Sequence, residues 1–192
     1  MNIKPLIRSL CVIGAITTIS ASANAAPIFF AGNGHYYEHI ATTTTWTAAR
    51  TAALGMTHLG QSGYLATITS AAENMFLATM LTSNDGWIGG TDQAAEGDWK
   101  WADGPEAGVT FWNGAAGGSS PTFASWNFGE PNDVNGEDYA HLQIGLWNDL
   151  PNISTSRGYF VEYNATVPEP GTLALFALGL AGLGLARRRK AA

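Results

Sequence analysis

The sequence WNFGEPNDVNGEDYAHLQIGLWND, residues 126–149, decides how this chain is interpreted. It concentrates side-chain oxygens in two short segments that we expect to be loops. The oxygen-bearing residues are Glu130, Asn132, Asp133, Glu137, Asp138, Asn148 and Asp149. The stretch has no thiol and one imidazole, His141. Calcium takes about six to eight oxygen ligands, whereas zinc favours nitrogen and sulfur. The stretch therefore predicts a calcium site whose open positions could take the vicinal hydroxyl groups of a sugar.

The motif Glu130-Pro131-Asn132 indicates how one site could hold both an ion and a sugar. A cis peptide bond before Pro131, which proline tolerates, would turn the flanking side chains toward a common point. Glu130 can only accept hydrogen bonds, whereas the amide of Asn132 can also donate. A sugar diol on the ion needs both partners, because each hydroxyl is donor and acceptor. Asn148 and Asp149 would supply the same pairing from the opposite strand.

The first 25 residues have the composition of a secretory signal peptide. Lys4 and Arg8 precede an apolar run at residues 10–16, and small residues follow as far as Ala25. An N-terminal membrane anchor is the alternative, but the apolar run is too short to cross a bilayer. We therefore predict a signal peptide over residues 1–25, cleaved after Ala25, and export of the remainder.

The last 26 residues, 167–192, carry a second signal. Pro168, Glu169 and Pro170 lead into the 15 uncharged residues 172–186 and then a basic tail at residues 187–190. The apolar segment is shorter than the roughly 17–25 residues of a stable transmembrane helix, and the basic tail would stay cytoplasmic. This order resembles the PEP-CTERM sorting signal of Gram-negative bacteria, read by the membrane enzyme exosortase. It implies transient membrane insertion, cleavage and delivery to the cell surface or the extracellular matrix; a plain tail anchor is the alternative.

The segment between the two signals, residues 27–166, has the length of one domain and is strongly acidic. It has three basic residues against 14 acidic ones, a formal charge of −11. Nucleic acid is therefore excluded as a partner, because no basic surface could neutralise phosphates. Half of the acidic residues lie in the segments that we assign to cations, and bound divalent ions would relieve their repulsion. The single cysteine, Cys11, lies in the signal peptide, so the domain has no internal disulfide.

Two amphipathic helices are predicted in this segment. The threonines at residues 42–45 supply an N-cap for the first, and Ser70 with Glu73 forms a capping box at the start of the second. Apolar residues at helical spacing define the faces that we expect to be buried. In the first helix these residues are Trp46, Ala49, Ala53 and Leu54. In the second helix they are Met75, Phe76, Met80 and Leu81.

The remaining regular structure is predicted to be β-sheet. Strands are expected at residues 35–40, 64–68, 87–90, 99–101 and 159–163. Glycines at residues 60–63 break the chain, and residues 114–120 form a flexible insertion without chemistry of its own. Helices early in the chain and antiparallel strands later define an α+β domain. Aromatic burial must supply the core, although Trp126 and Trp147 could instead stack on a sugar.

Seven short motifs together resemble the C-type lectin-like domain. In chain order they are Trp46-x-x-Ala49, Tyr64-Leu65-Ala66-Thr67-Ile68, Trp87-Ile88-Gly89, Glu96-Gly97-Asp98-Trp99-Lys100-Trp101, Glu130-Pro131-Asn132, Gly136-Glu137-Asp138 and Trp147-Asn148-Asp149. Each tryptophan or glycine motif is weak alone, but the Glu-Pro-Asn and Trp-Asn-Asp motifs at the expected separation make the set specific. The resemblance implies a C-type lectin-like fold over residues 27–166, with two helices, antiparallel sheets and a long calcium-binding loop region.

The resemblance also implies two calcium sites. The principal site, which binds sugar as well, matches Glu130, Asn132, Glu137, Asn148 and Asp149. The second site matches Asp92, Glu96, Asp133, Glu137 and Asp138. Asp and Asn also favour turns for backbone reasons, so turn formation is the alternative at both sites. In the family, the order Glu then Asn accompanies mannose, glucose and N-acetylglucosamine, whereas the Gln-Pro-Asp order associated with galactose is absent here.

The chain departs from this family in lacking its two usual disulfides. Ala53, Val161, Tyr139 and Asn152 stand where the cysteines would be. Ala53 and Val161 could pack as apolar substitutes, whereas Tyr139 and Asn152 would leave the binding loops unstapled without calcium. The insertion at residues 113–125 also precedes the site closely and could reshape it.

Two functional hypotheses follow. The first is an exported, calcium-dependent carbohydrate-binding protein whose partners are glycans or the exopolysaccharide of a biofilm matrix. The second is a structural or adhesive surface protein that uses the calcium-stabilised fold to bind protein or matrix. We do not expect an enzyme, because the sequence has no G-x-S-x-G nucleophile motif. Paired carboxylates could suggest glycoside hydrolysis, but carboxylates saturated by calcium are poor general acids.

Overall fold

The computed structural model describes residues 26–80 and 85–165 of the chain. The predicted signal peptide and the predicted sorting signal, with Pro168, Glu169 and Pro170, lie outside these residues. Within the described ranges, no helix is both long and apolar enough to cross a membrane.

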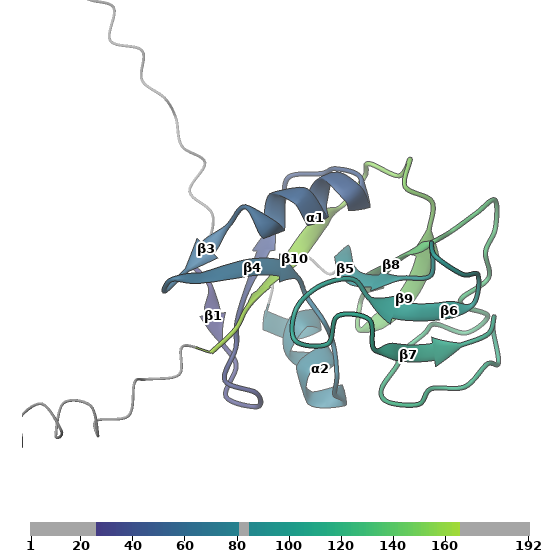
Figure 1. Cartoon of the computed structure of the whole chain (residues 1–192), viewed down its shortest axis with the longest axis horizontal. Coiled ribbons are helices and arrows are strands. Elements are labelled where there is room, and N and C mark those ends of the chain that lie inside the picture. Colours follow the sequence, from purple (N-terminus) through teal and green to yellow (C-terminus); the bar gives the residue numbers. More distant parts are fainter. Residues whose placement is uncertain (1–25, 81–84, 166–192) are drawn as a thin grey trace, which may run out of the picture.

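The described chain folds into two helices and ten strands (Figure 1). The helices are α1 (Trp46–Leu54) and α2 (Ala71–Met80). The strands of the first half are β1 (Ile28–Phe29), β2 (Tyr36–Ile40), β3 (Thr57–His58), β4 (Gln61–Leu65) and β5 (Asp85–Thr91). The strands of the second half are β6 (Asp98–Trp101), β7 (Thr110–Asn113), β8 (Tyr139–Gln143), β9 (Leu146–Leu150) and β10 (Gly158–Tyr163). The predicted α+β class is confirmed.

Strand β10 organises the sheet. It pairs antiparallel with β2 and β4, and parallel with β5. From β5 the sheet continues to β6 and β7 on one side and to the hairpin of β8 and β9 on the other. The sheet is therefore mixed, not purely antiparallel as the sequence had suggested. The β8–β9 hairpin carries part of the predicted site, so β10 and β5 connect that site to the body of the domain.

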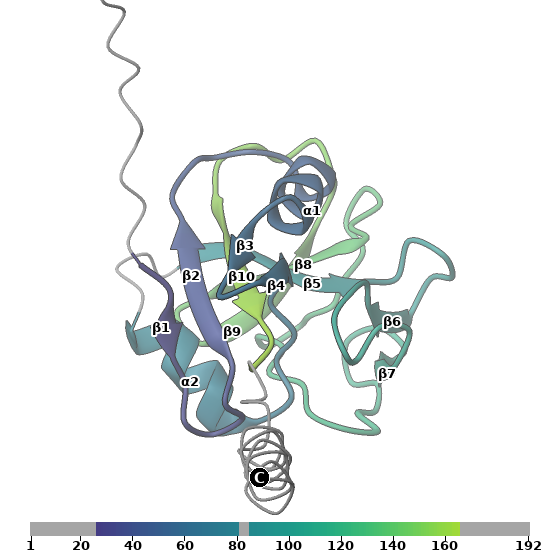
Figure 2. The same ribbon diagram turned by 60° about the vertical axis from the view of Figure 1, so that its left-hand side comes forward.

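The two helices cover opposite faces of the central strands (Figure 2). Successive residues of a strand point to opposite faces, and β10 follows this alternation. Val161 packs in one cluster with Trp46 of α1, whereas Phe160 packs in the other cluster with Leu77 of α2. The domain thus has two apolar layers, one on each face of the sheet.

Helix α1 agrees closely with its prediction. The Thr45 hydroxyl accepts a hydrogen bond from the backbone N–H of Ala48 at 3.3 Å, as an N-cap does. Trp46, Ala49 and Ala53 are buried against the sheet, whereas Leu54 is largely exposed. The buried face of α1 is therefore one residue narrower than expected.

Helix α2 buries a different face from the one predicted. Half of its capping box is present: the Ser70 hydroxyl accepts from the Glu73 backbone N–H at 3.2 Å, but the Glu73 carboxylate accepts from the backbone N–H of Thr69, one residue before the N-cap. However, Met75 is 66% exposed, and the buried positions are Glu73, Asn74 and Leu77. Phe76 packs against the core from a partly buried position, as predicted. Leu81 and the side chain of Met80 lie outside what the structure describes.

The buried polar residues of α2 are all satisfied by partners. Glu73 accepts from the backbone N–H of Thr69 and from the hydroxyl of Tyr37. Asn74 accepts from the indole of Trp147 at 2.7 Å and donates to the carbonyl of Gly145 at 2.6 Å. Buried polar groups are tolerated when they are hydrogen-bonded. The predicted apolar stripe is wrong because Tyr37, Gly145 and Trp147, which are distant in the sequence, supply partners for polar side chains of α2.

The expected break at residues 60–63 is instead the start of β4. Gly63 belongs to this strand, and a Cβ there would lie 2.8 Å from both the Ala53 carbonyl oxygen and a Val161 methyl group. Glycine is present because α1 and β10 pack closely on the strand. Five strands, β1, β3, β7, β8 and β9, have no counterpart among the predicted strands, although His141 was expected to be a strand position.

Tryptophan side chains fill the layer near the predicted site. Trp99, Trp101 and Trp147 are buried, and the Trp101 ring stacks on Phe111 at 4.2 Å between centroids. Trp126 is partly buried and meets Trp99 edge to face at 4.7 Å. The alternative of Trp147 stacking on a sugar is therefore wrong, and Trp126 is a packing residue as well.

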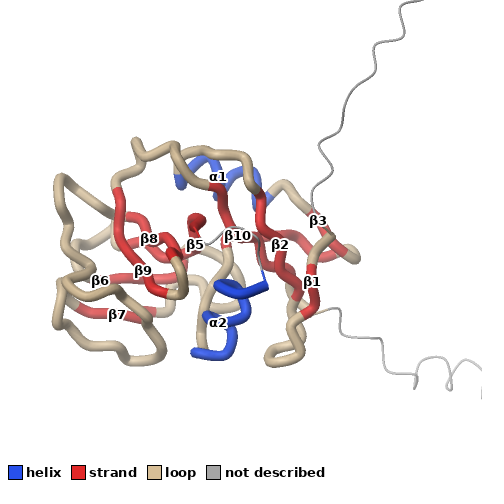
Figure 3. The backbone as a smooth tube through the Cα atoms, turned by 180° about the vertical axis from the view of Figure 1, so that it is seen from behind, coloured by secondary structure: helices blue, strands red, loops and turns tan. Residues whose placement is uncertain are grey.

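The long loops and the ends of the described chain occupy opposite poles of the domain (Figures 1 and 3). Phe29 of β1 and Tyr163 of β10 both pair with Tyr36, from its two sides. Neighbouring strands lie about 4.8 Å apart, so these two residues are separated by roughly 10 Å. The acidic loops around β6–β9 are at the far pole, where tan loop segments dominate in Figure 3.

Candidate functional site

The Glu130-Pro131 peptide bond is cis, as the motif had suggested. The amide nitrogen of Asn132 donates a hydrogen bond to Oε2 of Glu130. The two side chains that flank Pro131 thus lie against each other at the surface. This is the arrangement expected if both are to face one ligand.

Asp149 reaches the same place from β9. Its Oδ2 accepts from the backbone N–H groups of Asn132 and Asp133, both at 2.9 Å. The motif at residues 130–132 and the Trp-Asn-Asp motif, 17 residues apart at these contacts, are therefore brought together in space. Asn148 and Asp149 lie in strand β9, as a pairing from the opposite strand requires, and not in the loop segments first expected for the acidic stretch. A strand position fixes Asp149 beneath the loop more firmly than a loop position would.

The second oxygen of Asp149 has no donor. Asp149 is fully buried, and its Oδ1 receives no hydrogen bond from the described residues. Burial, followed by the neighbouring Asp149 carboxylate, raises the pKa of Glu130 to about 7. When ionised, these two carboxylates repel each other across a short gap. A cation between them would remove both the repulsion and the unsatisfied oxygen.

Glu137 and Asn148, the other two members of the predicted principal site, each make a different hydrogen bond. The Glu137 carboxylate accepts from the Val134 backbone N–H at 3.2 Å, which holds it over the loop. Asp149 and Asp133 raise the pKa of Glu137, after the larger effect of burial. Asn148 donates its amide hydrogen to the backbone carbonyl of Asp149. Its amide oxygen remains the candidate ligand atom.

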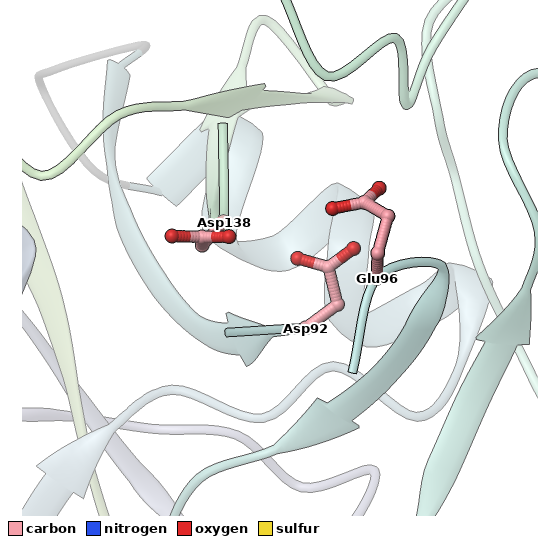
Figure 4. Close-up of side chains that lie close together, drawn as sticks. All are labelled: Asp92, Glu96 and Asp138. Carbon is pink, nitrogen blue, oxygen red and sulfur yellow. The ribbon is translucent and has the colours of Figure 1, made fainter. Parts of the chain in front are cut away.

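The second predicted group assembles around Asp92, at the end of β5. The carboxylate oxygens of Asp92, Glu96 and Asp138 lie within 4.8 Å of one another, and Figure 4 shows the three side chains facing a common space. Asp133 and Glu137, which the sequence assigned to the same site, are not part of this close group. Asp133 nevertheless raises the pKa of Glu96 and of Asp138, with burial as the larger cause for both groups.

Asp92 has the same signature as Asp149. Its Oδ2 accepts from the Gly97 backbone N–H at 2.8 Å, whereas its buried Oδ1 has no partner among the described residues. Burial, followed by the negative charges of Glu96 and Asp138, raises its pKa to about 7. Two buried carboxylate oxygens without donors, each among other carboxylates, form a donor set made only of oxygen. That chemistry fits a hard divalent cation such as calcium.

The insertion at residues 114–120 is not the passive loop that the sequence suggested. Gly114 donates its backbone N–H to the Gly97 carbonyl at 2.7 Å, and Ala116 donates to the Pro131 carbonyl at 2.8 Å. Gly97 is the residue that hydrogen-bonds Asp92. The insertion therefore connects the loop of the Asp92 group to the Glu130-Pro131-Asn132 motif. No side-chain pattern in the sequence could indicate this, because the bonds are made by the backbone.

At the four positions where the family has disulfide cysteines, the side chains of this chain make other contacts. Ala53 and Val161 share one apolar cluster, as anticipated. Tyr139 is buried and packs on Trp46 at 4.7 Å between ring centroids. Asn152 accepts from the Thr47 backbone N–H at 3.1 Å and donates to the Thr47 hydroxyl. The end of the β9 loop is thus attached to the start of α1 through hydrogen bonds.

Comparison with known families assigns the described domain to one class. The model of the Lectin C-type domain matches residues 43–151, and the model of the PEP-CTERM protein-sorting motif matches residues 166–190. This chain belongs to the C-type lectin family. Domains of this family generally bind calcium, and the family is in general not enzymatic.

Individual relatives are similar over much of the described domain. A segment of halomucin from Haloquadratum walsbyi is 42% identical over 139 residues, which is 71% of this chain but only 2% of halomucin. An α-N-acetylgalactosamine-specific lectin from Patiria pectinifera is 33% identical over 65% of this chain and 71% of its own length. The carbohydrate-recognition domain of cow CD23, solved in the presence of a GlcNAc2Man3 oligosaccharide, superposes with a TM-score of 0.58. It is 27% identical and covers 76% of this chain and 98% of its own.

Proposed function

We propose that this protein is an exported, calcium-dependent carbohydrate-binding protein. Glu130, Asn132, Glu137, Asn148 and Asp149 would hold one calcium ion and the sugar. Asp92, Glu96 and Asp138, with Asp133 and Glu137 at their edge, would hold a second ion. The observation that carries the proposal is the meeting of the Glu130–Asn132 pair with Asp149, whose buried Oδ1 has no hydrogen-bond donor among the described residues.

The chemistry of this pair supports binding of a sugar diol. Calcium, when bound, supplies a centre with more coordination positions than the protein oxygens fill. Glu130 accepts a hydrogen bond from one sugar hydroxyl, and the amide of Asn132 donates to its neighbour. The order Glu then Asn favours mannose, glucose and N-acetylglucosamine, which present equatorial 3- and 4-hydroxyls. The sorting motif supports export, followed by exosortase processing and delivery to the cell surface or an extracellular matrix.

The test is retention of residues 27–166 on mannose or N-acetylglucosamine resin in calcium and in EDTA. We expect retention in calcium only, and its loss in Asn132→Asp, which replaces the donor by an acceptor at an exposed position. Asp103→Asn is the matched control, because Asp103 pairs with Arg50 at 2.6 Å, outside both acidic groups. Retention that persists in EDTA would contradict the proposal.

A calcium-stabilised protein that binds no sugar is the alternative outcome. In that case calcium would raise the melting temperature while no glycan on an array is retained. This result would favour a structural or adhesive surface protein that recognises protein or matrix components.

A further inference from the structure

One aromatic side chain at the edge of the site is fully exposed. Phe128 lies two residues before Glu130 and has 101% of its reference surface in contact with solvent. No other large apolar side chain among the described residues reaches this value; Ile153, the next, is 85% exposed. A single exposed apolar residue is ordinary on a protein surface. Phe128 differs from such residues because it lies in a turn directly beside Glu130.

Phe128 is held at the tip of a fixed turn. The Glu130 backbone N–H donates to the Asn127 carbonyl at 3.0 Å, which closes a turn over residues 127–130. Gly129 has φ of +88°, the value that a type II turn requires at its third position. Asn127 donates to the Trp147 carbonyl at 2.8 Å, so the turn is attached to β9. The turn therefore presents the ring from a fixed backbone.

The backbone of Phe128 lies close to that of Glu130, so a sugar bound at Glu130 is within the length of the Phe128 side chain. Two residues span at most about 7 Å of extended chain, and a turn shortens that distance. This is comparable to the width of one pyranose ring. A sugar whose hydroxyls face the Glu130–Asn132 pair still has an apolar surface of C–H groups. An exposed aromatic ring beside it can cover that surface and remove both from water.

We propose that Phe128 is a specificity-determining contact, whose ring packs on the C–H face of the pyranose held at the Glu130–Asn132 site. This inference rests on the proposed function. Phe128 is only two residues from Glu130, but its side chain has no oxygen that could bind calcium. It therefore affects the affinity of the protein for sugar and not its affinity for calcium. It favours sugars that turn C–H groups toward the ring over sugars in which an axial hydroxyl points at the ring.

The experiment measures the affinity of the exported protein for methyl α-mannoside and for calcium by titration calorimetry. Phe128→Ala is expected to weaken sugar binding about fivefold, corresponding to roughly 1 kcal/mol, with an unchanged dissociation constant for calcium. Phe128→Trp, which enlarges the ring, is expected to retain or tighten sugar binding. Ile153→Ala removes an exposed apolar side chain elsewhere and is expected to change neither affinity.

A second readout identifies the contact itself. Ring currents shift the NMR signals of protons that lie over an aromatic face, so sugar C–H protons should shift upfield with the wild type. The shift should vanish in Phe128→Leu, which keeps an apolar side chain. If the wild type binds sugar and Phe128→Ala binds it equally well, this inference alone is overturned. If the wild type binds calcium but no sugar, the proposed function is overturned together with it.

Discussion

Asp149 shows how one residue can unite two sequence motifs. Its Oδ2 accepts from the backbone N–H groups of Asn132 and Asp133, and its Oδ1 has no donor in the part of the chain that the structure describes. A buried oxygen without a donor is energetically unfavourable. Asp149 is therefore already positioned to bind an ion. Glu130 and Asn132, next to it in space, would supply further oxygen ligands.

The order of the residues around Pro131 should determine which sugar is chosen. Exchanging them, in the double substitution Glu130→Gln with Asn132→Asp, keeps the net charge and nearly all the atoms. It reverses which side of the site only accepts hydrogen bonds. We expect loss of mannose binding and a gain of binding to galactose-type sugars, measured on a monosaccharide panel in calcium. An unchanged preference would show that other residues set the specificity.

The raised pKa values of Asp92 and Glu130, about 7 for each, make calcium binding sensitive to pH. A carboxyl group whose pKa is raised in the folded state stabilises that state below its unfolded pKa, near 4. This contribution is lost as the pH rises through about 7. The calcium-free domain should thus melt at a lower temperature at pH 8 than at pH 5.5.

Calcium affinity should follow the opposite trend. Below pH 7 calcium must displace protons from these carboxyl groups, so its affinity should fall between pH 8 and pH 5.5. Titration calorimetry at the two pH values, in buffers of different ionisation enthalpy, would detect the released protons. Asp92→Asn should reduce the number released. Equal calcium affinity at both pH values would contradict this account.

Among the elements, the insertion at residues 114–120 shows which contacts cannot be predicted from the sequence. Its glycines and serines predict a loop correctly, but its backbone bonds to Gly97 and Pro131 connect both acidic groups. In helix α2, Asn74 is buried because Trp147, 73 residues away, provides its partner. Local spacing could predict the capped ends of both helices and the site motif. Pairings that depend on tertiary neighbours could not be predicted in this way.

The link through Ala116 can be tested without disturbing the insertion itself. The Gly118 N–H donates to the Ala115 carbonyl and Gly117 has φ of +81°, so Ala116 occupies the turn position that proline favours. Ala116→Pro removes the hydrogen bond to Pro131, a loss of about 1 kcal/mol. A less flexible unfolded chain offsets about 0.4–1 kcal/mol of that loss.

The melting temperature of Ala116→Pro should therefore change little, while calcium affinity falls about fivefold as the two loops lose their connection. Ala116→Gly keeps the N–H group and serves as the control. Calorimetric titration of calcium would compare the two variants. If their affinities are equal, the hydrogen bond to Pro131 does not organise the site.

At the scale of the whole domain, the formal charge of −11 over residues 27–166 makes divalent cations a general source of stability. A ligand present at 100 times its dissociation constant adds about 2.7 kcal/mol to the stability of the folded state. For a domain of this length that corresponds to a rise of roughly 10 °C in melting temperature.

Calcium should produce this rise, and magnesium a much smaller one, because magnesium gives up its water ligands reluctantly. Differential scanning calorimetry in EDTA, calcium, magnesium and sodium chloride of matched ionic strength separates binding from simple screening. An equal rise in all three salts would show that screening alone stabilises the domain.

Phe29 and Tyr163 flank Tyr36 on neighbouring strands, so the chain enters and leaves the domain within roughly two strand spacings. A unit with this geometry can be spliced into a surface bend of an unrelated host polypeptide without pulling that bend apart. It can also be threaded many times along one very long molecule, and each copy would still present its recognition surface outward. Ends this close together allow the domain to serve as a module that can be moved between host polypeptides.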